Sequence, residues 1–101
     1  MGQRLDLHYI LEDKLGSTNV YFQPPESVKL QYPCIIYERI IDNVEYADNY
    51  PYKKRRLYSI KVIDRNPDSI IPDKVGEIPY SSTDTSYTKN NLNHYIFNIY
   101  Y

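Results

Sequence analysis

The spacing of hydrophobic residues near the N-terminus predicts an α-helix. Apolar side chains recur there at intervals of three and four residues, which places them on one side of a helix. These residues are Leu7, Ile10, Leu11 and Leu15. Gly16 follows where a helix commonly ends on a left-handed residue. A helix of about three turns is marginal alone, so we expect its apolar stripe to pack on another element.

Alternation of apolar and polar residues predicts that strands follow this helix. Every second side chain of a strand lies on the same face of its sheet, and five segments show this alternation or a β-prone composition. These segments are residues 19–22, 32–41 (YPCIIYERII), 52–65 (YKKRRLYSIKVIDR), 82–88 (STDTSYT) and 94–101 (HYIFNIYY). Residues 89–91 (KNN) are typical of a turn between the last two strands.

A second, shorter helix is expected within residues 66–79 (NPDSIIPDKVGEIP). Asp68 or Ser69 can cap such a helix, and Pro72 is tolerated only in its first turn. Pro79 ends it. The resulting order is α-β-β-β-α-β-β, which indicates an α+β fold with two helices packed on a small antiparallel sheet.

The length of 101 residues is typical of one domain, so we expect a single domain over residues 1–101. Residues 42–52 (DNVEYADNYPY) separate two predicted strands and indicate a hairpin loop longer than is common. The chain contains 13 tyrosines. This high number favours half-buried strand positions and protein–protein contacts, although the codons of an AT-rich genome would also raise the number of tyrosines. The loop is therefore a candidate interface. Its candidate contact residues are Asp42, Glu45, Tyr46, Asp48, Tyr50 and Tyr52.

Four consecutive cations, KKRR, enter the predicted strand 52–65 in a chain whose formal net charge is −1. That balance excludes a globally basic nucleic-acid binder of the histone type. Alternation along a strand would divide the run, with Lys54 and Arg56 on the face of Tyr58 and Lys53 and Arg55 on the opposite face. Three interpretations stay open: a small nucleic-acid-binding module, a basic band in a ring of subunits, or charges that protect an edge strand from aggregation.

Few residues suggest catalysis. Cys34 lies in an apolar run and is expected to be a small buried hydrophobe, and it could pair with His94 only if the fold brought the two together. We expect His8 and His94 at surface or interface positions. The chain shows no glycine-rich phosphate loop and no regularly spaced metal ligands. We therefore expect no enzymatic activity, no cofactor and no metal.

Three aspartates, Asp64, Asp68 and Asp73, lie within ten residues of one another. They could converge on a divalent cation. The alternative is that they form Asx turns and helix caps, which also explains the interleaved prolines, and we favour it. No apolar run approaches the roughly 20 residues that span a bilayer, and we expect a soluble protein made in a cytoplasm.

Three segments resemble small virion proteins of tailed bacteriophages, the tail-terminator or neck group that includes minor capsid and tail completion proteins. They are PPESVKLQYPCIIYER, YKKRRLYSIKVIDRNPDSIIPDKVGEIP and NNLNHYIFNIYY, and VIDRNPDSIIPDK is the most specific part. The similarity covers roughly residues 18–101, and the predicted order of helices and strands also fits this family.

The resemblance implies a structural role in the virion neck or tail, with assembly in the host cytoplasm. Tail terminators form a ring, typically a hexamer, that docks on the last ring of tail-tube subunits and presents a surface to the head connector. DNA would pass the lumen only as cargo. No catalytic residues carry over from the family. The candidate lumen or inter-subunit cations are Lys53, Lys54, Arg55 and Arg56.

Overall fold

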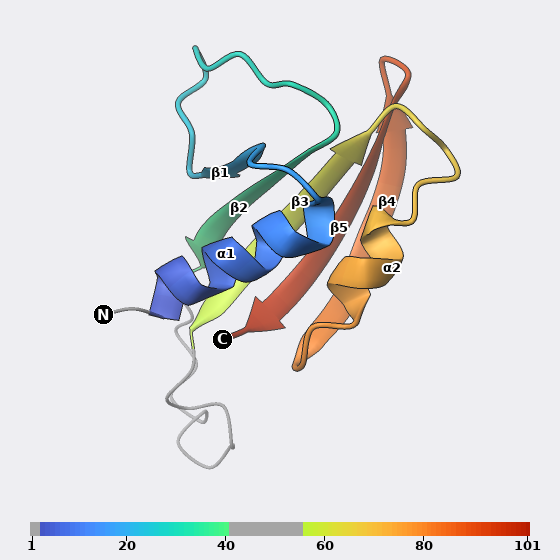
Figure 1. Cartoon of the computed structure of the whole chain (residues 1–101). Helices are drawn as coiled ribbons and strands as arrows, with labels where there is room; N and C mark the ends of the chain where they lie inside the picture. The colour runs from blue at the N-terminus through green and yellow to red at the C-terminus, as the bar shows by residue number, and fades with distance from the viewer. Residues whose placement is uncertain (1–2, 41–55) are drawn as a thin grey trace.

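A computed structural model describes residues 3–40 and 56–101 of the chain (Figure 1). The order of its elements confirms the predicted α-β-β-β-α-β-β arrangement and the α+β class. The elements are α1 (Gln3–Leu15), β1 (Val20–Phe22), β2 (Cys34–Ile40), β3 (Leu57–Asp64), α2 (Ile71–Gly76), β4 (Ser81–Lys89) and β5 (Leu92–Tyr100).

The strands form one sheet in the order β1-β2-β3-β5-β4. Neighbouring strands are antiparallel except at one edge, where β1 runs parallel to β2. The sheet is therefore mixed, and the predicted antiparallel pairing is wrong for β1. A parallel pair needs a connection that carries the chain back to the same end of the sheet, and residues 23–33 provide it.

Both helices lie on the same side of the sheet (Figure 1). We call this side the covered face; in β3 and β5 it carries the buried residues Ile60, Val62, Phe97 and Ile99. The other side, which we call the open face, carries the alternate residues of the same strands. The fold thus has two layers, and its hydrophobic core lies between the helices and the covered face.

Helix α1 follows the predicted pattern closely. Leu7 and Leu11 are fully buried and Leu15 nearly so, which confirms the apolar stripe. The helix ends at Gly16, which has a φ of +85° and donates its backbone N–H to the carbonyl of Glu12 over 2.8 Å. A residue without a Cβ adopts this left-handed conformation at little cost, so the predicted end of the helix is also confirmed.

Helix α2 is one short segment in which Pro72 occupies the first turn, as predicted. Ile71, Val75 and the following Ile78 are buried against the core. The N-cap residue is Ile70 and no side chain caps the helix, so the predicted capping by Asp68 or Ser69 is wrong. The hydroxyl of Ser69 does accept the N–H of Ile71, the first residue of the helix, over 3.2 Å.

Strands β4 and β5 form a hairpin whose turn residues, Asn90 and Asn91, both have positive φ angles. Such angles suit a tight turn between twisted strands, which confirms the turn predicted from KNN. A β-bulge between Thr83 and Thr85 shifts the register of β4. Within residues 3–40 and 56–101, no helix has the length and apolar character needed to cross a membrane.

Candidate functional site

The open face combines apolar residues with charges near its centre. Lys61 projects from the central strand β3, and its cross-strand partners are Ile36 on β2 and Ile96 on β5. All three side chains are partly exposed. Glu38 and Asp84 join these residues around a shallow pocket of about 300 Å³. Among the described residues, Lys61 has no carboxylate within ion-pair distance.

An aromatic pair stands at one end of the open face. The rings of Tyr87 and His94 are stacked, with centroids 4.5 Å apart and planes 8° from parallel. Burial lowers the pKa of His94, and the positive charges of Lys61 and Lys89 lower it further. The buried Nδ1 of His94 has no hydrogen-bond partner among the described residues. This end of the face is therefore positively charged, with an exposed tyrosine ring beside it.

The outer surface of α1, on the side away from the sheet, is apolar and acidic. Leu5 is 45% exposed and Tyr9 is 62% exposed, one helical turn apart. Asp6 and Asp13 are also exposed on this helix. We call the set of Leu5, Tyr9, Asp6 and Asp13 the outer surface of α1.

A chain of polar contacts joins α1 to β2 beneath the helix. Tyr37 is fully buried, and its hydroxyl lies 2.8 Å from Nδ1 of His8 and accepts a hydrogen bond from Arg4 over 3.2 Å. Nε2 of His8 lies 3.3 Å from Glu12. If the Tyr37 hydroxyl donates to Nδ1 of His8, then Nε2 carries the ring proton and points it toward Glu12. In this arrangement each polar group of the series from Arg4 to Glu12 has a partner.

These contacts resemble a carboxylate–histidine relay, but their position makes them structural. A general base needs to lie within hydrogen-bond reach of a substrate proton, and the side chain of Tyr37 is sealed between helix and sheet. Burial raises the pKa of Tyr37, and the charge of Arg4 offsets part of this rise. The hydroxyl is thus a neutral anchor that fixes α1 on β2. The sequence predicts a surface or interface position for His8, whereas the ring is part-buried and bonded to Tyr37.

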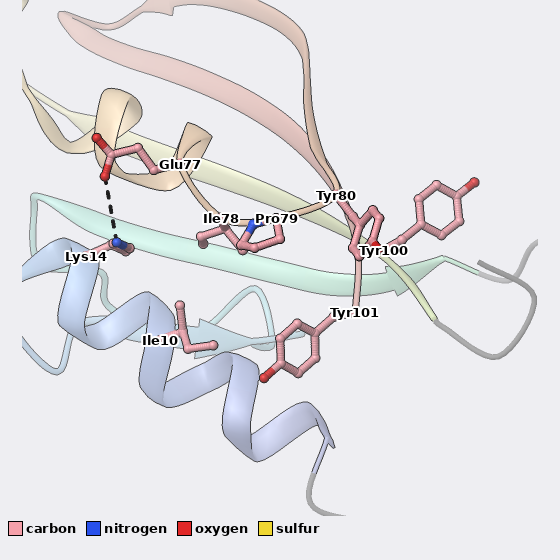
Figure 2. A pocket seen from close by; sticks show the side chains of 8 residues that line it. All are labelled: Ile10, Lys14, Glu77, Ile78, Pro79, Tyr80, Tyr100 and Tyr101. Carbon is pink, nitrogen blue, oxygen red and sulfur yellow. Dashed lines mark ion pairs between the residues drawn. The ribbon is translucent and has the colours of Figure 1, made fainter. Parts of the chain in front are cut away.

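A pocket of about 430 Å³ opens where α1 and the segment after α2 approach the C-terminal end of β5 (Figure 2). Ile10, Ile78 and Tyr101 give it an apolar lining. An ion pair closes one end, with Nζ of Lys14 3.9 Å from a carboxylate oxygen of Glu77. These two charges are paired with each other, and the apolar lining suits an apolar group.

Of the four predicted basic residues, Arg56 alone lies within the described residues. It is exposed, and its backbone N–H and carbonyl both bond to Tyr101, over 3.0 and 2.8 Å. Its role in a lumen or contact stays a prediction. The other basic residues and the candidate loop lie outside the described residues. They are Lys53, Lys54, Arg55, Asp42, Glu45, Tyr46, Asp48, Tyr50 and Tyr52.

Cys34 is fully buried, which confirms its predicted place in the interior. Burial raises the pKa of its thiol to about 11, so the thiol is protonated and unreactive near neutral pH. Cys34 and His94 share one cross-strand row, since both pair with Ile63 on β3. Two strand spacings of about 4.8 Å separate them, so they do not form a thiol–imidazole pair.

The aspartate cluster forms turns. A carboxylate oxygen of Asp64 accepts the N–H of Asn66 over 3.0 Å, and the side chain of Asn66 accepts the N–H of Asp68 over 3.0 Å. These are the predicted Asx turns. Within the part of the chain that the structure describes, no group of three or more His, Cys, Asp or Glu residues is placed to hold a metal ion.

No protein-family model matches this chain, and no curated protein or solved structure matches it either. The resemblance to phage tail-terminator and neck proteins therefore stays a prediction.

Proposed function

We propose that this protein is a structural subunit of a tailed-bacteriophage virion. In this role it forms a ring, typically of six copies, at the head–tail junction, where it caps the tail tube and joins it to the head connector. Its partners are further copies of itself, the tail-tube protein and the connector proteins, and DNA crosses the lumen only as cargo. An adjacent ring of the same neck region is the alternative position.

The observation that carries the proposal is the two-layer fold. Both helices cover one face of the sheet, and the open face presents Ile36 and Ile96 beside Lys61, which has no ion-pair partner among the described residues. Sheets that are apolar on a face generally bury that face against another layer. A sheet with only one covered face is therefore suited to a subunit that completes its packing in an assembly.

The phage assignment rests on the sequence resemblance and on the order of the elements. Capping a tube requires complementary surfaces and no reaction. The buried polar groups fit such a role, because Tyr37 is occupied by Arg4 and His8, and Cys34 is a protonated thiol in the interior.

Purified full-length protein tests the proposal when it is mixed with purified tail tubes. We expect rings in negative-stain images, at tube ends or alone, a mass by light scattering that is a multiple of the subunit mass, and arrest of further tube growth. A protein that stays monomeric at high concentration and never binds tubes overturns the proposal.

The same preparation distinguishes the structural role from the nucleic-acid interpretation of the KKRR run. The test variant replaces all four cations with serine, at Lys53, Lys54, Arg55 and Arg56. Salt-sensitive DNA or RNA binding by the wild type that this variant loses, without any ring formation, would replace the structural role with a nucleic-acid-binding one. Ring formation that persists in the variant supports the structural role.

A further inference from the structure

The chain carries two different exposed surfaces on opposite sides of its two layers. One is the outer surface of α1, with Leu5, Tyr9 and two aspartates; the other is the open face around Lys61 and Ile96. We propose that the outer surface of α1 in one copy packs on the open face of the next copy. This inference deepens the proposed function and rests on it, because it names the contact between neighbouring subunits.

The positions of the two surfaces determine what kind of assembly this contact makes. Helix α1 lies on the covered face, so its outer surface and the open face point in opposite directions (Figure 1). A contact between two different patches is heterologous, and it leaves each copy with one patch free for a further copy. Repetition of such a contact closes into a ring when the rotation between copies allows it.

The two surfaces also match in shape. Helix α1 has 13 residues and is therefore about 20 Å long. Strands β3 and β5 have 8 and 9 residues and extend for about 26 to 30 Å. Helix α1 already packs on the covered face, beside α2 and over β1 and β2, so a second helix on the open face would complete an α/β/α arrangement of common type.

The area of the open face is sufficient for a specific contact. Four strands at a spacing of about 4.8 Å and a length of about 26 Å present roughly 500 Å² in projection, and more as accessible surface. Standard interfaces bury about 800 Å² on each partner. Helix α1, about 20 Å long and about 10 Å wide, would cover roughly 200 Å² of this projection, and flanking residues of the neighbouring copy would cover more of it.

The charges of the two surfaces are complementary. Asp6 and Asp13 are exposed on α1. On the open face, His94 pairs with Ile63 on β3 and with Tyr87 on β4, and Lys61 and Lys89 lie two residues from these positions on the same face. Glu38 and Asp84 line the same pocket as Lys61, so the positive charge is concentrated toward the His94 end, and no described carboxylate lies within ion-pair distance of Lys61. The aspartates of one copy can therefore meet the lysines of the next, which favours correct docking over other encounters.

A symmetric contact between two open faces fits the charges less well. Lys61 lies on β3, the central strand of the sheet, so a two-fold axis through the middle of the face would bring two copies of this lysine together. Like charges in direct opposition are unfavourable. Glu38 and Asp84 lie beside Lys61 on the same face, and they soften this repulsion without removing it.

Disulfide trapping between single-cysteine additions tests the contact directly in the full-length protein. The variants are Tyr9→Cys on α1 and Ile96→Cys on the open face, prepared separately and then mixed at high concentration under mild oxidation. We expect a cross-linked dimer in the mixture and none in either variant alone. Wild-type protein treated in the same way shows whether the native Cys34, which is fully buried, contributes any cross-link. Asp68→Cys, exposed on a loop outside both surfaces, is the matched control partner for Tyr9→Cys and should not cross-link.

The results separate this inference from the proposed function. Absence of the mixed cross-link in a preparation where wild type forms rings overturns the contact and leaves the function standing. A dimer of Ile96→Cys with itself also overturns the contact, because it indicates packing of open face on open face. A mixed cross-link without rings or tube binding supports the contact and overturns the function.

Charge reversal gives a second measurement that does not depend on cysteine chemistry. Lys61→Glu should weaken self-association about tenfold, as expected for the loss of an interfacial charge pair. Adding Lys89→Glu, Asp6→Lys and Asp13→Lys should restore it, because the charges of both surfaces are then reversed together. Circular dichroism checks that each variant is folded. Failure of the combined variant to recover association overturns the pairing of these two surfaces.

Discussion

The two faces of the sheet are built from the same strands but differ in what they bury. On β5, Ile99 faces the helices and is fully buried, whereas Ile96 lies on the open face and is partly exposed. At the centre of the covered face the side chains are apolar apart from the hydroxyls of Tyr37 and Tyr58, while the open face carries Lys61 on the central strand. Stability therefore resides mainly on the covered face, and the open face can carry charges at little cost to the core.

The largest expected effect comes from truncating the same residue type on the two faces of one strand. Ile99→Ala should lower the free energy of unfolding by about 3 kcal/mol, because it leaves a cavity in the core. Ile96→Ala should cost about 1 kcal/mol, because its side chain is already partly hydrated. Urea denaturation of both variants measures the difference. Equal losses would show that the open face is buried in the protein in solution.

Cys34 lies on the open face by strand alternation and is nevertheless fully buried. Burial raises the pKa of its thiol from 9.0 to about 11. Between these values the unfolded chain releases the thiol proton and the folded chain keeps it, so stability falls as pH rises through this window. The loss attributable to the thiol should reach about 2 to 3 kcal/mol at the upper end.

Tyrosines also titrate at high pH, so the test of this effect is a difference between two proteins. The unfolding free energies of wild type and Cys34→Ala are measured from neutral pH to about pH 11, above the ordinary pKa values of Cys and Tyr. The free energy of unfolding should be larger for the wild type than for Cys34→Ala at neutral pH, and this difference should shrink as the pH rises. Parallel curves for the two proteins would mean that the thiol is hydrated in the folded state.

Tyr37 tests whether a polar contact contributes to the covered face. Tyr37→Phe removes the hydroxyl that bonds to His8 and Arg4 and leaves both groups without this partner. We expect a loss of about 1 to 2 kcal/mol in the free energy of unfolding. Tyr58→Phe is the matched control, since Tyr58 is buried on the same face and its hydroxyl has no hydrogen bond to a described residue. Similar losses in both variants would contradict the anchoring role.

Much of this fold follows from local sequence patterns. The apolar spacing ending at Leu15 predicts α1, Gly16 predicts its end, and alternation predicts which residues of β2, β3 and β5 share a face. The turn at residues 89–91 is also local, since asparagine tolerates positive φ. These features are predictable because each depends on residues a few positions apart.

The features that depend on distant residues were not predicted. The parallel pairing of β1 is set by the path of residues 23–33, and three residues carry too little pattern to indicate a direction. The contact between His8 and Tyr37 spans 29 positions. Its only local signal is the four-residue spacing of Arg4, His8 and Glu12, which places them on one side of α1. Nor does alternation show which face of the sheet the helices cover.

The smallest expected effect concerns the open face and the pH dependence of its histidine. Burial and the charges of Lys61 and Lys89 lower the pKa of His94 from 6.5. As the pH falls below 6.5, the unfolded chain binds a proton at this ring before the folded chain does, so the contribution of His94 to stability is lost. The ring is partly exposed, so the loss should be smaller than that for Tyr37→Phe.

A titration of the His94 ring by NMR, from about pH 8 to about pH 4, measures this pKa directly. Lys61→Gln should raise it toward the ordinary value, because one of the two nearby positive charges is gone. If α1 of a neighbouring copy brings Asp6 and Asp13 to this end of the open face, assembly should raise the same pKa further, since carboxylates favour the charged ring. A pKa that is identical in dilute and assembled protein would place the aspartates elsewhere, and the open face would then select its partner by other groups.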